Sequence, residues 1–285
     1  MKSKVYFTRD LTPEGVVKLY GMLGAELGDK IAVKLHSGEK GNQNFIGPEF
    51  WRPIIEQVGG VVVECNTAYE GERNKTDRHR RLMDDHGWTK YFDVDILDAE
   101  GPDKVLEIPA GKMIKKNYVG KDIENYDSML VLSHFKGHPM GGYGGAIKQL
   151  SIGVASSFGK AYIHGAGDPQ KLWSADHDSF LESMADAALS VAEYFGRRCA
   201  YINVMKNMSV DCDCCAVAED PCIPDIGILA SLDPVAVDKA RHALIWFMLA
   251  MRRERRILSN VLRAVTARTQ YLPRKNWAWA VRNTN

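Results

Sequence analysis

Short apolar stretches alternate with longer amphipathic stretches along most of the chain. The apolar stretches are bounded by turn residues, which is typical of buried strands. The strongest of them is the run Ser-Met-Leu-Val-Leu-Ser at 128–133. We predict strands over 31–35, 61–63, 93–97, 105–109, 113–119, 128–133, 200–204 and 226–230.

Helical periodicity separates these strands. In 178–195, the apolar positions Phe180, Met184 and Val191 recur at helical spacing. Thr12 and Asp233 each precede a proline, the order of an N-cap and a first helical residue. We predict helices over 12–27, 48–57, 76–86 and 178–195, and from 233 towards 251. The alternation indicates an α/β fold, with a mostly parallel or mixed sheet flanked by helices in one or two lobes.

Composition places the chain among globular proteins. It has 285 residues, of which 45% are hydrophobic and 26% charged, and this argues against disorder and fibrous structure. The longest apolar run, 243–251, is much shorter than the roughly 18–20 residues that a membrane span needs. The opening MKSKVYFTRD does not resemble a secretory signal. We therefore expect a cytoplasmic protein with no membrane partner.

The net charge of +1 hides an uneven distribution. Residues 241–285 contain nine arginines and one lysine against a single acid, Glu254. We therefore separate an α/β domain over 1–250 from an atypical basic tail over 251–285. The tail could be a nucleic-acid-binding arm, a solvated basic helix or the product of a shifted reading frame. We favour the shifted frame and do not expect a nucleic-acid partner.

A glycine-rich segment, 133–150, follows the strongest predicted strand. Clustered glycines let backbone N–H groups turn towards one point, and a following helix N-terminus adds positive potential. Neither the Rossmann nor the P-loop spacing is present. We favour a loop that binds an anionic ligand or cofactor over a simple connector, because ligands of open α/β sheets bind beyond the carboxyl ends of strands. The candidate binding residues are Lys136, Gly141, Gly142, Gly144, Gly145 and Lys148.

The same segment contains two histidines three residues apart, His134 and His138. They could converge as metal ligands or as an acid–base pair, and we take them as the candidate catalytic residues. His164 is a third candidate, and His36 follows the first predicted buried strand. An isolated histidine is more often structural, but the glycine turn favours a role in the site.

Four cysteines lie within eleven residues. Two of them are adjacent, which is too close for an unstrained disulfide. Thiolates at irregular spacing favour a soft metal, with an iron–sulfur cluster ahead of zinc. The neighbouring acidic residues are expected to raise the thiol pKa values in the absence of metal. The candidate metal ligands are Cys212, Cys214, Cys215 and Cys222.

Several segments resemble a known family, the domain-of-unknown-function family 362, whose members are commonly labelled uncharacterised iron–sulfur-cluster proteins. The resemblance implies an α/β fold and a cysteine-associated cluster but no established reaction. It also implies that Cys212, Cys214 and Cys222 are ligands and that Cys215 is an extra thiol. It rests on ECNTAYEG (64–71), SHFKGHPMGGYGGAIKQL (133–150), HGAGDP (164–169), VDCDC (210–214) and DIGILASLDPVAVDKA (225–240).

Three functions follow as hypotheses. The first is a cytoplasmic protein that binds an iron–sulfur cluster, of the 4Fe-4S type, and acts in redox chemistry or electron transfer with a partner protein; zinc is the alternative metal. The second is a metal-dependent enzyme that holds a small anionic substrate at the glycine–histidine loop. The third is nucleic-acid binding through the basic tail.

Overall fold

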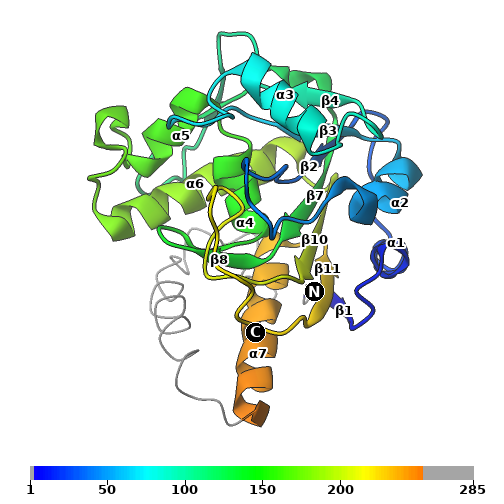
Figure 1. The fold of residues 1–285 in the computed structure, drawn as a ribbon. Coiled ribbons are helices and arrows are strands. Elements are labelled where there is room, and N and C mark those ends of the chain that lie inside the picture. Colours follow the sequence, from blue (N-terminus) through cyan, green and yellow to red (C-terminus); the bar gives the residue numbers. More distant parts are fainter. Residues whose placement is uncertain (1–2, 253–285) are drawn as a thin grey trace.

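The computed structural model describes residues 3–252, which fold around a seven-stranded sheet (Figure 1). Its strands are β1 (Val5–Thr8), β2 (Ile31–Lys34), β3 (Val61–Glu64), β4 (Val94–Ile96), β7 (Ser128–His134), β10 (Cys199–Met205) and β11 (Gly227–Ser231). Their order is β1-β11-β10-β7-β2-β3-β4. The five strands from β10 to β4 are parallel, and β11 is antiparallel to both neighbours. The predicted α/β fold is confirmed.

Helices cover both faces of the sheet. They are α1 (Pro13–Gly21), α2 (Pro48–Val58), α3 (Thr76–Asp85), α4 (Ala146–Lys148), α5 (Ser157–His164), α6 (His177–Phe195) and α7 (Pro234–Arg252), with short helices η1 (Lys121–Asn125), η2 (Gln149–Gly153) and η3 (Pro169–Lys171). One apolar core joins the sheet to α1, α2 and α3, and another joins it to α4, η2, α6 and α7. Figure 1 shows α1 and α2 on one side of the sheet and α4 and α6 on the other.

Strand β7 lies between β10 and β2, and all seven of its residues are buried. Leu130 and Leu132 belong to one core, whereas Met129 and Val131 belong to the other. Successive side chains of a strand point to opposite faces, so a strand covered on both faces is apolar throughout. This explains why 128–133 is the clearest strand signal in the sequence.

Two predicted elements are shorter than expected. Helix α1 ends at Gly21 rather than near residue 27, and the chain turns at Gly24, which has a φ of +60°. The strand predicted over 113–119 is β6 (Lys116–Val119), which pairs with β5 (Lys104–Glu107). Its predicted first residues do not join this ladder: the amides of Met113 and Ile114 donate to the Asp186 carboxylate instead.

The predicted helix caps are confirmed. The Thr12 hydroxyl accepts a hydrogen bond from the amide of Gly15 at 3.1 Å, and the Asp233 carboxylate accepts from Val235 and Ala236. No helix within residues 3–252 is long and apolar enough to cross a membrane. The predicted basic tail, 251–285, lies outside the described residues apart from the last two residues of α7.

Candidate metal centre and cationic cavity

The carboxyl ends of the parallel strands β2, β3 and β7 meet at one edge of the sheet, and a cavity lies there. It contains about 750 Å³ of empty space, part of which is open to solvent. Residues at and just after the ends of the three strands line it, including Cys65, together with residues of α4, η2 and α5 and a second cysteine, Cys214. Ligands of open α/β sheets bind in this position.

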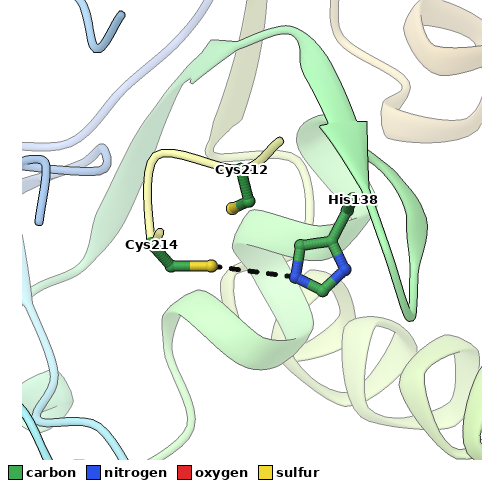
Figure 2. Close-up of side chains that lie close together, drawn as sticks. All are labelled: His138, Cys212 and Cys214. Atoms are coloured by element: carbon green, nitrogen blue, oxygen red, sulfur yellow. Dashed lines mark hydrogen bonds between the residues drawn. The ribbon is translucent and has the colours of Figure 1, made fainter. Parts of the chain in front are cut away.

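The glycine-rich segment forms a hairpin beside the cavity, with strands β8 (Lys136–His138) and β9 (Gly142–Gly144). The turn fixes the ring of His138, whose Nδ1 accepts hydrogen bonds from the amides of Met140 (3.2 Å) and Gly141 (2.8 Å). Its Nε2 lies 3.9 Å from Sγ of Cys214 (Figure 2). Gly142 has a φ of +74°, a conformation that favours glycine.

Changing Gly142 to alanine is expected to lower the free energy of unfolding by about 1–2 kcal/mol, because an L-residue is strained in the left-handed region. The matched control is Gly21→Ala in α1, where an added Cβ meets nothing within 4 Å. There we expect a small gain of about 0.5–1 kcal/mol. Urea unfolding measures both variants. A Gly142→Ala variant as stable as the parent would show that the turn does not need a glycine.

Two of the predicted ligands, Cys212 and Cys214, approach His138. Their sulfur atoms and a ring nitrogen of His138 all lie within 4.8 Å of one another, and Figure 2 shows the three side chains converging. Cys212 is buried, and the other two residues are partly buried. The structure therefore brings His138 together with two cysteines that lie more than 70 positions later in the sequence.

The loop that carries the cysteines is fixed by a segment that follows β2. The side-chain amide of Asn42 donates to the carbonyl of Cys215 at 2.9 Å, and the backbone amide of Glu39 donates to the carbonyl of Asp213 at 2.8 Å. The amide of Cys215 donates to the carbonyl of Cys212 at 2.9 Å, which closes a tight turn around the two converging thiols. These bonds position Cys212 and Cys214.

The other two predicted ligands do not belong to this group. Cys215 is partly buried and Cys222 is exposed, with its backbone amide bonded to the carbonyl of Met208. Neither thiol lies within 4.8 Å of all three atoms of the group formed by His138, Cys212 and Cys214. Ligand roles for Cys215 and Cys222 stay predictions.

Asp213, between the two converging cysteines, is buried and paired with Lys136 and His134. Its carboxylate contacts Nζ of Lys136 at 2.5 Å and Nδ1 of His134 at 2.9 Å. Nε2 of His134 contacts the carbonyl of Lys206 at 2.6 Å. His134 lines the cavity, but both of its ring nitrogens already have oxygen partners. The structure thus places this candidate catalytic residue as a support for Asp213.

The electrostatics of the thiols differ from the sequence-based expectation. A hydrogen bond from Cys214 lowers the pKa of the Cys212 thiol well below its ordinary value; burial opposes this, and Lys148, His138 and Lys136 add to it. The same hydrogen bond raises the pKa of Cys214. The pKa of Cys215 is lowered to about 7, chiefly by its hydrogen bond with Cys214. The net shifts of Cys212 and Cys215 are therefore opposite to the expectation, because the hydrogen bonds from Cys214, and for Cys212 the lysines, outweigh the acids. Asp211 does raise the pKa of Cys215, and the pKa of Cys222 is raised as predicted, by burial and by Glu219 and Asp211.

Cations dominate the cavity wall. Three of them are neutralised: Lys34 pairs with Glu64 at 2.6 Å, Arg73 with Glu39 at 3.0 Å, and Lys136 with Asp213. Lys148 and Lys160 also line the cavity, and neither has a carboxylate within 4.0 Å among residues 3–252. Nζ of Lys148 lies 3.9 Å from Sγ of Cys212. Lys148 therefore leaves excess positive charge in the cavity beside the converging thiols.

The helix that follows the glycine-rich segment, α4, was expected to add the positive potential of its N-terminus to an anion site, and it does not. The first amides of α4, at Ala146 and Ile147, donate to the buried carboxylate of Asp238 at 3.0 and 3.1 Å. These groups are therefore not available to an external anion. Gly144 and Gly145 line the cavity, together with Lys136 and Lys148, whereas Gly141 lies in the hairpin turn and Gly142 is the first residue of β9. In this structure the lysines, rather than the backbone amides, are the groups that face an anion.

A family model described as "Domain of unknown function (DUF362)" matches residues 31–242. The chain belongs to this family. No curated protein matches it. The resembling segments named above contribute to the same cavity: Cys65 and Tyr69 come from the first, Lys136 from the second, His164 from the third and Cys214 from the fourth. The resemblance to the family is thus confirmed.

Two solved structures have a similar fold. A protein from Thermotoga maritima matches with a TM-score of 0.50 and 14% identity, over 82% of this chain and 58% of its own. The lactate racemase apoprotein from Thermoanaerobacterium thermosaccharolyticum matches with a TM-score of 0.43 and 12% identity, over 71% of this chain and 49% of its own. This chain therefore spans about half to three fifths of their lengths. At such identities the likeness concerns the fold alone.

Several residues of this family 362 site were not identified from the sequence. Glu64 and Cys65 end β3 or follow it directly, and Arg73 comes nine residues after that strand. Their position after a predicted parallel strand is a usable signal, because such strands end at one edge. Lys160 gives no comparable signal, since it lies within a helix, α5, that the sequence pattern did not predict.

Proposed function

We propose that this protein binds a soft metal centre through Cys212 and Cys214, beside His138, and that the centre acts on a small anion in the adjoining cavity. The observation that carries the proposal is the convergence of two sulfurs and one imidazole nitrogen at a cavity with two lysines that lack carboxylate partners. Soft thiolate ligands favour zinc, copper(I) or iron–sulfur centres over hard cations.

The three side chains fit one metal ion closely. With a metal–sulfur distance of about 2.3 Å, three ligand atoms around one ion lie about 4 Å from one another. Sγ of Cys214 and Nε2 of His138 are 3.9 Å apart, and all three atoms lie within 4.8 Å of one another, so the group can close around one ion by a contraction of less than about 1 Å. Because Nδ1 of His138 accepts a hydrogen bond from the amide of Gly141, the neutral ring carries its hydrogen on Nε2, next to Cys214. His138 therefore donates to a thiolate in this state, and it becomes a ligand only when its hydrogen moves to Nδ1.

The cavity residues suit a small carboxylate or phosphate. Lys148, near Cys212, positions an anion oxygen beside the thiols. A bound cation would keep the thiols ionised and would polarise an oxygen of the anion. His164, on α5, also lines the cavity, and its Nδ1 lies 2.7 Å from the carbonyl of Lys160. Burial lowers the pKa of His164 to about 4, so its ring is neutral at pH 7 and Nε2 carries a free lone pair.

Replacing Lys148 by methionine is expected to weaken binding of inorganic phosphate to the metal-free protein by about 10- to 100-fold. A hydrogen bond from a charged group contributes about 1.5–3 kcal/mol, which corresponds to this range. Isothermal titration calorimetry measures the affinity. The matched control is Lys40→Met, at an exposed lysine outside the cavity lining. Equal losses in the two variants, or no loss in Lys148→Met, would contradict an anion site at Lys148.

An iron–sulfur cluster is the second candidate. The observation that favours it is the presence of two further thiols, Cys215 and Cys222, on the same loop. A 4Fe-4S cluster binds each thiolate through a different iron and needs ligands spread more widely than the present group. Electron transfer would also require a redox partner protein and fits the predicted cytoplasmic location. Iron and acid-labile sulfide in equal amounts identify this candidate, whereas one zinc ion per chain identifies the single-ion site.

A further inference from the structure

Lys160 differs from the other buried lysines of the cavity. Its side chain lines the cavity, yet the residue is only 7% exposed. Lys34 and Lys136 are equally enclosed, but each pairs with a carboxylate. Nζ of Lys160 donates to one neutral group, the carbonyl of Ala155, at 2.6 Å. Within the described range, no carboxylate oxygen lies within 4.0 Å of it. Lys160 is therefore a buried amine without a direct counter-ion.

Its surroundings favour the neutral form of the amine. Lys160 lies in the first half of α5, whose N-cap is Ser156, and the positive end of a helix disfavours a nearby cation. Burial lowers the pKa of Lys160, and the charge of Lys34 acts in the same direction, whereas Cys65, Asp98 and Glu64 oppose it. A desolvated lysine near another cation is the usual environment of a nucleophilic amine.

A proton acceptor lies one helical turn away. His164 follows Lys160 by four residues on α5, and both line the cavity. Its ring stacks on Phe180, with centroids 4.8 Å apart and an interplanar angle of 19°. Donation from Nδ1 to the carbonyl of Lys160 leaves Nε2 without a hydrogen in the neutral ring. The helix thus presents an amine and a fixed imidazole base to one cavity.

We propose that Lys160 captures the carbonyl group of a small 2-oxo acid as an imine, while Lys148 holds the carboxylate of the same molecule. The part of this inference in which Lys148 binds the carboxylate of the 2-oxo acid rests on the proposed function. Nζ forms a bond to the carbonyl carbon as the C=O π bond breaks. The first amine proton passes through His164 to the carbonyl oxygen, which becomes a hydroxyl. The second amine proton follows the same route as the C–O bond breaks, so that water leaves and the C=N bond forms. The step needs no oxidant, reductant or metal.

Reductive trapping with pyruvate tests this inference. The wild-type protein, metal-free and metal-loaded, is incubated at pH 7 with pyruvate and cyanoborohydride, and peptide mass spectrometry locates the reduced adduct. We expect Lys160 to be labelled at least ten times faster than Lys40, which is exposed and serves as the internal control. Lys160→Arg should abolish the rapid phase while it preserves the positive charge, and acetone, which lacks the carboxylate, should label Lys160 much more slowly than pyruvate.

Labelling of Lys160 no faster than that of Lys40 would overturn the inference. So would rapid labelling that persists at another lysine in Lys160→Arg. Phosphate affinity and metal content, measured on the same preparations, separate this failure from failure of the proposed function. If phosphate and metal still bind but no adduct is trapped, only the imine hypothesis is wrong. If the adduct is trapped rapidly in a protein that binds no metal, only the proposed metal centre is wrong.

Discussion

Replacing Cys212 by serine is expected to reduce the bound metal to less than a tenth of the wild-type content. Cys212 is the buried thiol of the group, and nearby Lys148 and Lys136 favour its thiolate form, which is the ligand. Cys214→Ser should have the same effect, because the two sulfurs converge with His138. Elemental analysis of anaerobically prepared protein measures the metal content.

Two other cysteines provide matched controls. Cys65 and Cys199 are buried like Cys212 but lie outside the converging group. Sγ of Cys65 contacts the carbonyl of Val154 at 3.2 Å. Cys65→Ser and Cys199→Ser should therefore keep their metal. Equal metal loss in these controls would indicate general damage to the fold, and full metal content in Cys212→Ser would exclude Cys212 as a ligand.

Changing Asp213 to asparagine is expected to destabilise the fold by about 3–5 kcal/mol, because it leaves a buried cation, Lys136, without its partner. The melting temperature should fall by about 10 °C in a domain of this size. Differential scanning calorimetry measures the change. We also expect weaker metal binding, since Asp213 separates Cys212 and Cys214 and fixes their loop to His134.

The control for Asp213 is Asp225→Asn. Asp225 is exposed and pairs with Lys206 at 3.4 Å, and an exposed ion pair contributes about 0–1 kcal/mol. A melting temperature for Asp213→Asn within two degrees of the control would show that the buried pairs do not determine the stability of the cysteine loop.

The fold could be predicted largely from local patterns. β7 is recognisable because a strand covered on both faces must be apolar throughout, and Thr12 and Asp233 are recognisable as helix caps. β1 and α5 were missed. β1 has only four residues, of which none is fully buried, and α5 contains Gly159, where close packing against the backbone of Tyr118 excludes a side chain.

The candidate site was predicted in part. The cysteine cluster and His138 can be recognised from the local sequence, because closely spaced thiols and a glycine–histidine turn are uncommon outside functional sites. The pairing of Asp213 with Lys136, 77 residues away, carries none, since it depends on how β7 and the cysteine loop meet. For the same reason the sequence could not show that His134 is already bonded at both nitrogens.

The metal content of the wild-type protein tests the central claim most directly. The protein is purified anaerobically, reconstituted in parallel with zinc alone and with ferrous iron plus sulfide, desalted, and analysed for zinc, iron and acid-labile sulfide per chain. The account predicts one tightly bound metal centre per chain that Cys212→Ser fails to retain. A wild-type protein that binds neither zinc nor iron and sulfide after reconstitution would contradict it.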